Sequence, residues 1–392
     1  MMSYSAWWLF ALAASAVSAN DCSQDYDIIS QDGINDISQC ARMSGNIRVA
    51  STNLTTLHLP NLTVLRGDLF IKDNDYLKSV ELPRLLRLNG ALALFKNGVL
   101  ETLDTPALTY LRSLEAVDNP QLKNVGFPAE LRDIDLLRLV GSRVIKLGGI
   151  KPQGVGSIEI VDNPEMDTIS FNHLVKVHSS LRIANNHETC SLHLPSLTNI
   201  GRGLELAHLR IVKAPRLESV GGGVHVHDNW FEEIELDDLT EVEESVRLHN
   251  NSQLRVFSLR ALERVGGSLV VYNNTQLESI ADLDELETVN GDINIRGSFR
   301  TLSMLQLEQT AGRIIIKSTE RLDCKDIKKN LAIKPASDKW VCQEEVDRNE
   351  VIALAESDQS GGKNGAVQPT PGWSMGIALG VTGLMSIVQF LF

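Results

Sequence analysis

The sequence has little of several features that mark common classes of protein. With a net charge of −13, it lacks the excess of Lys and Arg by which proteins bind nucleic acid or anionic lipid. It has five cysteines but no Cys-x-x-Cys pair and no Cys/His cluster, which argues against a structural zinc site. Helical i, i+3, i+4 spacing is not sustained, which excludes ankyrin and tetratricopeptide arrays. Long uncharged apolar runs occur only near the two ends.

The first apolar run predicts a secretion signal. It extends from Ala6 to Val17 and is followed by Ser18 and Ala19, small residues of the kind found at a cleavage site. An N-terminal membrane anchor is the alternative, but the run is short for a membrane span. We therefore expect residues 1–19 to be removed as a signal peptide.

The last apolar run predicts a glycosylphosphatidylinositol (GPI) anchor. After Lys363, the last charged residue, come small residues starting at Asn364, then a polar spacer and an apolar tail from Met375 to Phe392. This order is typical of a GPI signal, whereas cytoplasmic Lys or Arg normally follows a transmembrane anchor. Asn364 is the predicted attachment residue, with Ser360 and Gly361 as alternatives, and residues 365–392 form the signal that is removed.

The cysteines and the glycosylation sequons also fit an exported protein. Cys22 and Cys40 precede the repeats described below, and Cys324 and Cys342 follow them, so their spacing predicts one local disulfide at each end. Cys190 is left as a free thiol, and its place in the repeat predicts that it points outward. The predicted N-glycosylation sites are Asn53, Asn61, Asn250 and Asn273.

One phrase recurs through most of the chain. It has the pattern L-x-[IV]-x-x-N-x-x-L-x-x-[VL]-x-L-P, as in GDLFIKDNDYLKSV (67–80) and GSLVVYNNTQLESI (267–280). Successive copies are 22 or 23 residues apart, apart from two double steps, and such a period predicts a solenoid whose coils pack on their neighbours. The alternating apolar residues predict short strands with one buried face. Recurrent prolines, such as Pro83 and Pro106, exclude a helix in each coil.

The asparagine of the phrase has a predicted structural role. At a tight corner its side chain can bond unpaired backbone groups of neighbouring coils, forming a ladder along the stack. The residue before it is predicted to face solvent. The ladder asparagines are Asn74, Asn97, Asn119, Asn163, Asn186, Asn229, Asn251 and Asn274.

These features predict an all-β fold, a right-handed parallel β-helix of about 12–13 coils with a short capping helix at each end. Caps are expected because the ends of such a stack otherwise expose unpaired strand edges. The predicted divisions are a signal peptide at 1–19, a disulfide cap at 20–44, repeats at 45–318 with a candidate break between two halves near 141–156, a second cap at 319–343, a linker at 344–364 and the GPI signal at 365–392.

This order of segments resembles that of the fungal GPI-anchored cell-wall-organisation proteins built from receptor L-domain-like repeats. The resemblance covers essentially the whole chain. It implies a surface protein that is required for wall integrity and has no established catalytic activity. The stalk before the anchor is shorter here than in many members. The partners implied are the outer leaflet of the plasma membrane, through the anchor, and wall glucan, chitin or mannoprotein.

An enzyme is the competing interpretation, because parallel β-helices also cleave polysaccharides. Glycoside hydrolysis needs two carboxylates across a cleft. One predicted outward column instead alternates in charge, through Glu115, Arg138, Glu159, Arg182, Glu205, His225 and Arg247. Alternating charges on adjacent strands indicate surface ion pairs. We expect no catalytic residue, no bound metal and no cofactor, with His225, His227, Asp228 and His249 interpreted as surface residues rather than as metal ligands.

The second predicted outward column is unusually apolar, which is typical of a partner surface or of a face covered by the protein's own loops or a second copy. The histidine and tyrosine positions at its far end are suited to stacking on sugar rings. The candidate binding residues are Phe95, Val117, Val140, Val161, His227, His249 and Tyr272. The sequence therefore predicts a non-enzymatic cell-surface glycoprotein, with an extracellular receptor-like module for a glycan or protein ligand as the alternative.

Overall fold

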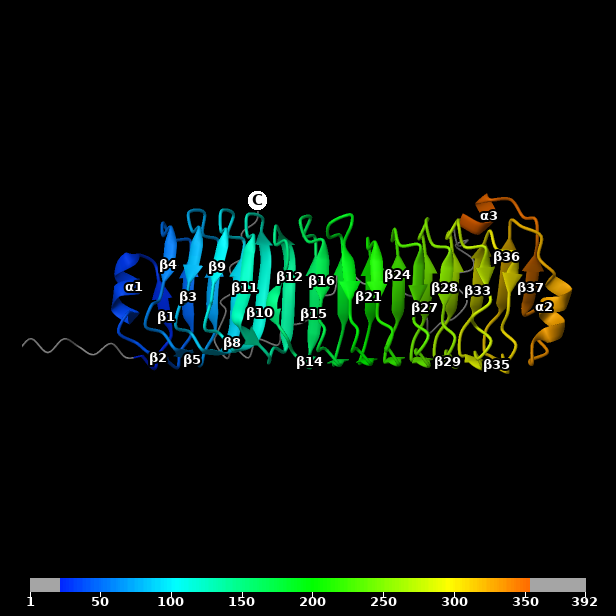
Figure 1. The fold of residues 1–392 in the computed structure, drawn as a ribbon, viewed down its shortest axis with the longest axis horizontal. Helices are drawn as coiled ribbons and strands as arrows, with labels where there is room; N and C mark the ends of the chain where they lie inside the picture. Colours follow the sequence, from blue (N-terminus) through cyan, green and yellow to red (C-terminus); the bar gives the residue numbers. More distant parts are fainter. Residues whose placement is uncertain (1–21, 353–392) are drawn as a thin grey trace, which may run out of the picture. The chain divides into compact units, whose positions relative to one another are not determined.

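The computed structural model describes residues 22–352, and these form a parallel β-solenoid of about 14 turns. The predicted fold class is confirmed. The count of 12–13 coils was slightly low because both end segments contribute a strand to the stack. Figure 1 shows the strands following one another in sequence order, from blue at the first helix to orange at the last strand. The predicted signal peptide, the GPI signal and Asn364 lie outside the described residues.

The main sheet has 17 strands, and all of its pairings are parallel. Each coil contributes one strand to this sheet. Two further short strands, β2 (Arg42–Met43) and β5 (Val64–Leu65), pair with each other, and β5 also pairs with the beginning of β8. The strands that form the stack are β1 (Tyr26–Ile28), β3 (Ile47–Ala50), β6 (Leu69–Lys72), β8 (Arg87–Phe95), β10 (Tyr110–Asn119), β12 (Leu136–Ser142), β15 (Ser157–Val161), β18 (Leu181–Ala184), β21 (Leu204–Ala207), β24 (Val224–His227), β27 (Val246–His249), β30 (Leu269–Tyr272), β33 (Ile293–Gly297), β36 (Ile314–Ser318) and β37 (Trp340–Gln343).

Shorter strands form the other sides of each coil. An eight-stranded sheet contains β14 (Gly154–Val155), β17 (Lys176–Val177), β20 (Asn199–Ile200), β23 (Ser219–Val220), β26 (Glu241–Val242), β29 (Arg264–Val265), β32 (Thr288–Val289) and β35 (Gln309–Thr310). The third side is divided among sheets that contain β4 (Thr56–His58), β7 (Ser79–Glu81), β9 (Thr102–Asp104), β11 (Asn124–Leu131), β13 (Gly148–Ile150), β16 (Thr168–Ser170), β19 (Ser191–His193), β22 (Ile211–Lys213), β25 (Glu233–Glu235), β28 (Val256–Ser258), β31 (Ser279–Ile280) and β34 (Thr301–Leu302).

The alternation in the repeat gives each main strand one inward face. Leu69 and Ile71 of β6 have no exposed surface, and the same inward positions recur in register on every neighbouring strand. Burial of such aliphatic side chains is the main favourable term in folding. The glycine that opens the phrase is needed because adjacent coils nearly touch at that corner. A Cβ on Gly67 would lie 2.4 Å from the carbonyl oxygen of Gly45.

The asparagine ladder is confirmed. In one part of it, Nδ2 of Asn229 donates to Oδ1 of Asn251 at 2.9 Å, and Nδ2 of Asn251 donates to Oδ1 of Asn274 at 3.0 Å. All eight ladder asparagines are buried. The residue before each of them has left-handed backbone geometry, with φ between 52° and 59°, which turns the chain at the corner. Thr52, Ser142 and Leu209 occupy the ladder position in three coils that lack the asparagine.

The candidate break near 141–156 does not interrupt the main sheet. Leu136–Val140 of β12 pair residue by residue with Ser157–Val161 of β15. The change lies on the other sides of the coil, where the sheet that ends at β13 is followed by the one that begins at β16, and where the eight-stranded sheet begins at β14.

Both predicted disulfides are present, and each lies beside a short helix. Cys22–Cys40 flanks α1 (Gln31–Ile37), whose Ile34 and Ile37 are buried in the core. Cys324–Cys342 joins the first residue of α2 (Cys324–Asn330) to β37, the last strand of the main sheet. Helix α2 has no fully buried side chain, so β37 itself completes this end of the stack.

The segment predicted as a linker from 344 is packed on the sheet in its first part. Helix α3 (Asn349–Ile352) packs against β33 and β36, with Val351 buried. Nζ of Lys317 lies 2.8 Å from Oε2 of Glu350, and Arg296, which is 3% exposed, donates from Nη1 to the Glu350 carbonyl oxygen at 3.4 Å. The short charged segment carries no sequence signal for this contact, which corrects the linker prediction up to residue 352.

Candidate binding surface on the outer face of the main sheet

The outward residues of the main sheet form the two columns expected from the repeat. We call them the charged column (Glu115, Arg138, Glu159, Arg182, Glu205, His225 and Arg247) and the apolar column (Phe95, Val117, Val140, Val161, Ala184 and Ala207, followed by His227, His249 and Tyr272). The register of the strands places consecutive members of the charged column side by side.

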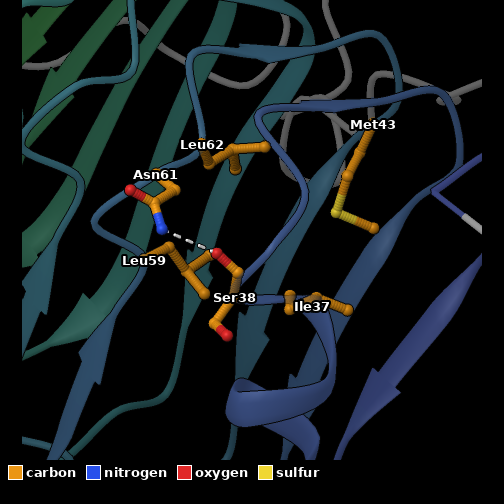
Figure 2. A pocket seen from close by; sticks show the side chains of 6 residues that line it. All are labelled: Ile37, Ser38, Met43, Leu59, Asn61 and Leu62. Carbon is orange, nitrogen blue, oxygen red and sulfur yellow. Dashed lines mark hydrogen bonds between the residues drawn. The ribbon is translucent and has the colours of Figure 1, made fainter. Parts of the chain in front are cut away.

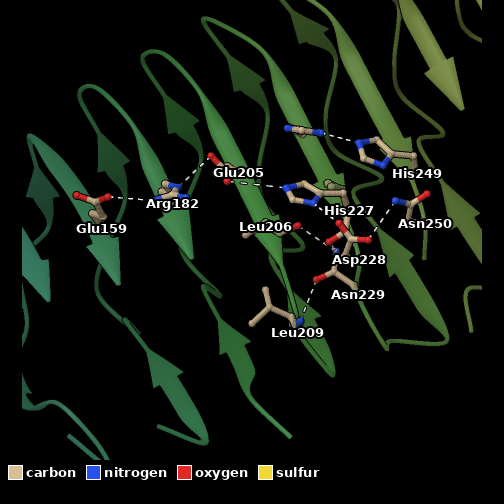
Figure 3. A network of polar contacts seen from close by, with 12 residues as sticks. Glu159, Arg182, Glu205, Leu206, Leu209, His227, Asp228, Asn229, His249 and Asn250 are labelled. Carbon is tan, nitrogen blue, oxygen red and sulfur yellow. Dashed lines mark hydrogen bonds and ion pairs between the residues drawn. The ribbon is translucent and has the colours of Figure 1, made fainter. Parts of the chain in front are cut away.

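Ion pairs join the middle of the charged column. Glu159 accepts a hydrogen bond from Nε of Arg138 at 2.8 Å. Arg182 donates from Nη1 to Glu159 and from Nε to Glu205, each at 3.1 Å (Figure 3). Burial lowers the pKa of Arg182, but the charges and hydrogen bonds of Glu205 and Glu159 outweigh it and raise that pKa overall. Burial acts to raise the pKa of Glu205, but the hydrogen bonds and charges of His227 and Arg182 outweigh it and lower that pKa, so this carboxylate is poorly suited to act as a general acid.

Glu115 differs from the other carboxylates of this column. It is 8% exposed, and burial raises its pKa, while the charge of Arg138 acts in the opposite direction. Its strand neighbours in the column are Ala93 and Arg138, so no second carboxylate adjoins it in the register. One carboxyl group of this kind is half of the pair that glycoside hydrolysis requires.

The apolar column is less open than the sequence predicts. Val161 and Ala184 are each 3% exposed and Ala207 is 2% exposed, and Val140 packs against this cluster. The prediction that this apolar column faces outward is therefore wrong for these three residues. The physical reason is that these small apolar side chains pack against one another on adjacent strands, which removes most of their surface from water. Phe95, Val117 and Val140 remain half-buried.

The histidine end of the columns is a stack of rings. His227 and His249 have ring centroids 5.3 Å apart with planes inclined by 16°, and His249 and Tyr272 are 4.8 Å apart and inclined by 13°. His225 lies 4.2 Å from His227, centroid to centroid. Because the rings stack on each other from strand to strand, their faces are largely occupied. This arrangement disagrees with the expectation that these rings are free to stack on sugars.

Hydrogen bonds fix the orientation of the rings (Figure 3). Nε2 of His225 lies 2.7 Å from Nε2 of His249, so one of these nitrogens carries the proton that the other accepts. Nδ1 of His227 lies 2.7 Å from Oδ2 of Asp228, and the other oxygen of Asp228 accepts a bond from Nδ2 of Asn250 at 3.1 Å. Nδ1 of His249 is buried and has no hydrogen-bond partner.

The environment separates the pKa values of the three histidines. Burial, followed by the charges of His227 and other neighbours, lowers the pKa of His225 and of His249 to about 4. Burial also acts against protonation of His227, but the hydrogen bonds and charges of Glu205 and Asp228 outweigh it and raise its pKa. Across residues 22–352, no group of three or more His, Cys, Asp or Glu side chains is placed to hold a metal ion.

Cys190 is free but does not face solvent. It has no exposed surface, and burial raises the pKa of its thiol to about 12. The corner of this coil is displaced by one residue. N–H of Cys190 donates to the His187 carbonyl at 2.8 Å, whereas in the coil before it Met166 bonds to Asn163 at 3.0 Å. Cys190 thus takes the inward place that Met166 holds, and the prediction of an outward thiol is wrong.

The four sequon asparagines differ in their exposure to solvent, and therefore in their access for an oligosaccharide. Asn53 and Asn61 are exposed, whereas Asn250 and Asn273 are half-buried at left-handed corner positions. Nδ2 of Asn273 donates to Oδ1 of Asn250 at 2.9 Å. Asn61 borders a shallow depression and donates from Nδ2 to the Ser38 carbonyl at 2.9 Å (Figure 2). The residues that line the depression are Ile37, Ser38, Met43, Leu59, Asn61 and Leu62.

No described helix is long and apolar enough to cross a membrane. The stacked coils, the asparagine ladder and the disulfide at each end define a parallel β-solenoid, which is consistent with L-domain-like repeats.

Comparison with known proteins confirms the resemblance to fungal cell-surface proteins. The chain is 25% identical over 373 residues to the "Cell surface GPI-anchored protein" of Arthroderma benhamiae, covering 92% of each chain. It is 27% identical to "Protein ecm33" of Aspergillus fumigatus, covering 80% of this chain and 78% of that one. It is 26% identical to "Sporulation-specific protein 22" of Saccharomyces cerevisiae, covering 77% and 66%. No protein-family profile matches the sequence, and no solved structure matches it.

Proposed function

We propose that this protein is a GPI-anchored glycoprotein of the fungal cell surface that organises the cell wall without catalysing a reaction. The observation that carries the proposal is the similarity, over 92% of both chains, to a relative described as a cell-surface GPI-anchored protein. The signal-like segments at both ends of the sequence support the same location, on the outer leaflet of the plasma membrane or in the wall.

The outer face of the main sheet supports binding rather than hydrolysis. The carboxylates of Glu159 and Glu205 both form ion pairs with Arg182, which favours a structural role for them over a catalytic one. The solenoid offers a long series of equivalent positions along which a polymer can be contacted repeatedly. Wall glucan, chitin and mannoprotein are the proposed partners.

Complementation of a deletion strain tests the role in the wall. Deletion of the gene in the fungus that encodes it should increase sensitivity to wall-stressing dyes, and the full chain should restore resistance. A matched variant that lacks residues 365–392 should be released into the medium and should fail to restore it. Normal wall resistance in the deletion strain would contradict the proposal.

Enzymatic release tests the anchor separately. Phosphatidylinositol-specific phospholipase should free the protein from washed membranes, and Asn364→Pro should reduce surface delivery or shift attachment to Ser360. Persistence of the apolar tail in the mature protein, detected by mass spectrometry, would instead identify a plain membrane anchor. A glycosidase assay on wall polysaccharides, with Glu115→Gln as the control variant, distinguishes binding from catalysis.

A further inference from the structure

The alternation of charge in the charged column stops at His225. From Arg138 to Glu205 each arginine has a carboxylate on a neighbouring strand, at 2.8 to 3.1 Å. Beyond Glu205 the next two positions are His225 and Arg247, and the strand after those presents Val270. Within residues 22–352, no carboxylate lies within ion-pair distance of Arg247, and the side chain is half-buried.

The side chains around Arg247 are polar and mostly hydrogen-bond donors. His225 is its neighbour across β24 and β27, His249 is two residues further along the same strand on the same face, and Tyr272 is the partner of His249 on β30. Asp228 is a carboxylate at the same end of the column, and it already accepts hydrogen bonds from His227 and Asn250. Among residues 22–352, the half-buried guanidinium of Arg247 thus has no carboxylate partner, and Nδ1 of His249 is buried without a hydrogen-bond partner.

The charge of Arg247 decides between two classes of ligand. Two imidazole nitrogens 2.7 Å apart on adjacent strands resemble part of a metal site. A metal ion would, however, lie beside a half-buried guanidinium, and the repulsion between two cations is strong where water is partly excluded. An anion gains from the same charge, and a guanidinium matches the geometry of phosphate and carboxylate with two parallel hydrogen bonds.

We propose that Arg247, with His225, His249 and Tyr272, forms a binding site for an oxyanion, namely the phosphate or carboxylate group of an acidic ligand. Arg247 holds two oxygens of the anion and the hydroxyl of Tyr272 donates a further hydrogen bond, while the paired imidazoles of His225 and His249 line the site and keep their mutual hydrogen bond. The inference rests on this arrangement of side chains alone and does not depend on the proposed role in the wall.

Binding of small anions by the full-length protein in detergent tests the site. In isothermal titration calorimetry, inorganic phosphate, mannose 6-phosphate and glucuronate are compared with neutral mannose. We expect the anions to bind and mannose not to bind. The ratio between the phosphate probes and glucuronate identifies which oxyanion the site prefers. Arg247→Gln should weaken anion binding by roughly tenfold or more, the loss of one charge-assisted pair of hydrogen bonds.

Matched variants separate this site from general charge effects. Arg138→Gln removes an equal charge from the same column but from an existing ion pair, and it should leave anion affinity unchanged. Tyr272→Phe should weaken anion binding by a smaller factor than Arg247→Gln. If Arg247→Gln does not fold, Arg247→Lys retains the charge but loses the two-point geometry, and it should bind anions less tightly than the unaltered protein.

Three results would overturn the proposal. The first is that the unaltered protein binds no anion even at tens of millimolar ligand, a concentration at which a site with a dissociation constant of about 1 mM would be nearly saturated. The second is equal affinity in the Arg247→Gln and unaltered proteins. The third is tight binding of Cu²⁺ or Zn²⁺ that is lost in His225→Ala, which would make the paired imidazoles a metal site instead. None of these results would change the outcome of the complementation test, so failure of the anion site and failure of the proposed function can be told apart.

Discussion

Three histidines that share one face of the solenoid experience opposite electrostatic environments. His225 and His249 are held neutral by burial and by the neighbouring positive charges, whereas Glu205 and Asp228 favour the charged form of His227. The result is a neutral imidazole pair beside a protonatable one. At the scale of the residue, this separation makes the stability of the protein depend on pH.

We expect the protein to lose stability as the pH falls from about 6.5 toward 4. The pKa values of His225 and His249 are near 4 in the folded state and 6.5 in the unfolded chain, so protons bind preferentially to the unfolded chain in this window. The raised pKa of His227 acts above this window, and the lowered pKa values of Glu205 and Asp228 act below it. Because both rings keep partial contact with solvent, the loss should be about 1–3 kcal/mol in total.

Urea unfolding at pH 7 and pH 5 measures this effect. The double variant His225→Gln/His249→Gln should lose less stability between the two pH values than the unaltered protein does. His173→Gln, at an exposed position, is the control and should behave like the unaltered protein. An equal pH dependence in all three proteins would show that the histidine pair remains unperturbed.

Cys190 should be inert in the folded protein. At pH 7 a thiol whose pKa is about 12 is ionised in about one molecule in 10⁵, and the thiolate is the reactive species. Maleimide should therefore not modify Cys190 under native conditions but should modify it after unfolding in guanidinium with the disulfides intact. Rapid native labelling, located by peptide mapping, would contradict the inward position of this side chain.

At the scale of the element, the ladder ties neighbouring coils together through buried amides. Asn251 donates to the Val226 carbonyl at 3.1 Å and to Asn274, and its Oδ1 accepts from the backbone N–H and from Nδ2 of Asn229, at 3.0 and 2.9 Å. One side chain therefore bonds two adjacent coils. Such fully satisfied buried networks make the position of each coil specific.

Asn251→Ala should destabilise the protein by about 1–3 kcal/mol, because it leaves the Val226 carbonyl and the Asn229 N–H of the preceding coil without this partner and removes a bond to Asn274 of the next coil. Asn124→Ala is the matched control, since Asn124 is exposed and its contact with Thr102 is long at 3.5 Å. The control should change stability by less than about 0.5 kcal/mol. Thermal unfolding of the two variants compares them directly, and equal melting temperatures would remove the ladder as a source of stability.

The repeat makes much of this architecture predictable from sequence. A fixed period places each asparagine, each inward leucine and each outward charge on the next strand, and the ladder and the ion pairs of Arg182 follow from it. Features that break the period are not predictable in this way. The corner at His187 is displaced by one residue, which buries Cys190, and the contact of α3 with Arg296 depends on a segment outside the repeat.

The candidate site shows the same division. The isolation of Arg247 is visible in the sequence, because His225 interrupts the alternation of charge. The 2.7 Å contact between His225 and His249 depends on side-chain rotation on neighbouring strands, which a pattern of residues does not specify. The burial of Val161 and Ala184 depends on their packing against each other on adjacent strands, which a two-state apolar or polar pattern omits.

At the scale of the whole solenoid, stability is approximately a sum of contacts between neighbouring coils, so a coil at an end is held from one side only. Each end of the described stack carries a disulfide that closes a separation of 18 residues. The chain-entropy model gives a bridge of this length about 3 kcal/mol of stabilisation. Each disulfide therefore stabilises an end coil, which packs against one neighbouring coil instead of two.

We therefore expect the double variant Cys324→Ser/Cys342→Ser to loosen one end of the solenoid and leave its middle intact. Strand β37 is paired only with β36 in the main sheet, and α2 adds no fully buried side chain to hold it. Hydrogen exchange measured by mass spectrometry should accelerate in β37 and β36 and change little in β15 and β18, far from either end. Exposure of the freed strand edge should also promote association between copies, which light scattering detects.

The control is Cys190→Ala, which removes a thiol from the middle of the stack and should leave exchange at β37 unchanged. Uniform acceleration throughout residues 22–352 would show that the solenoid unfolds as one cooperative unit and that the terminal disulfide stabilises all of it equally.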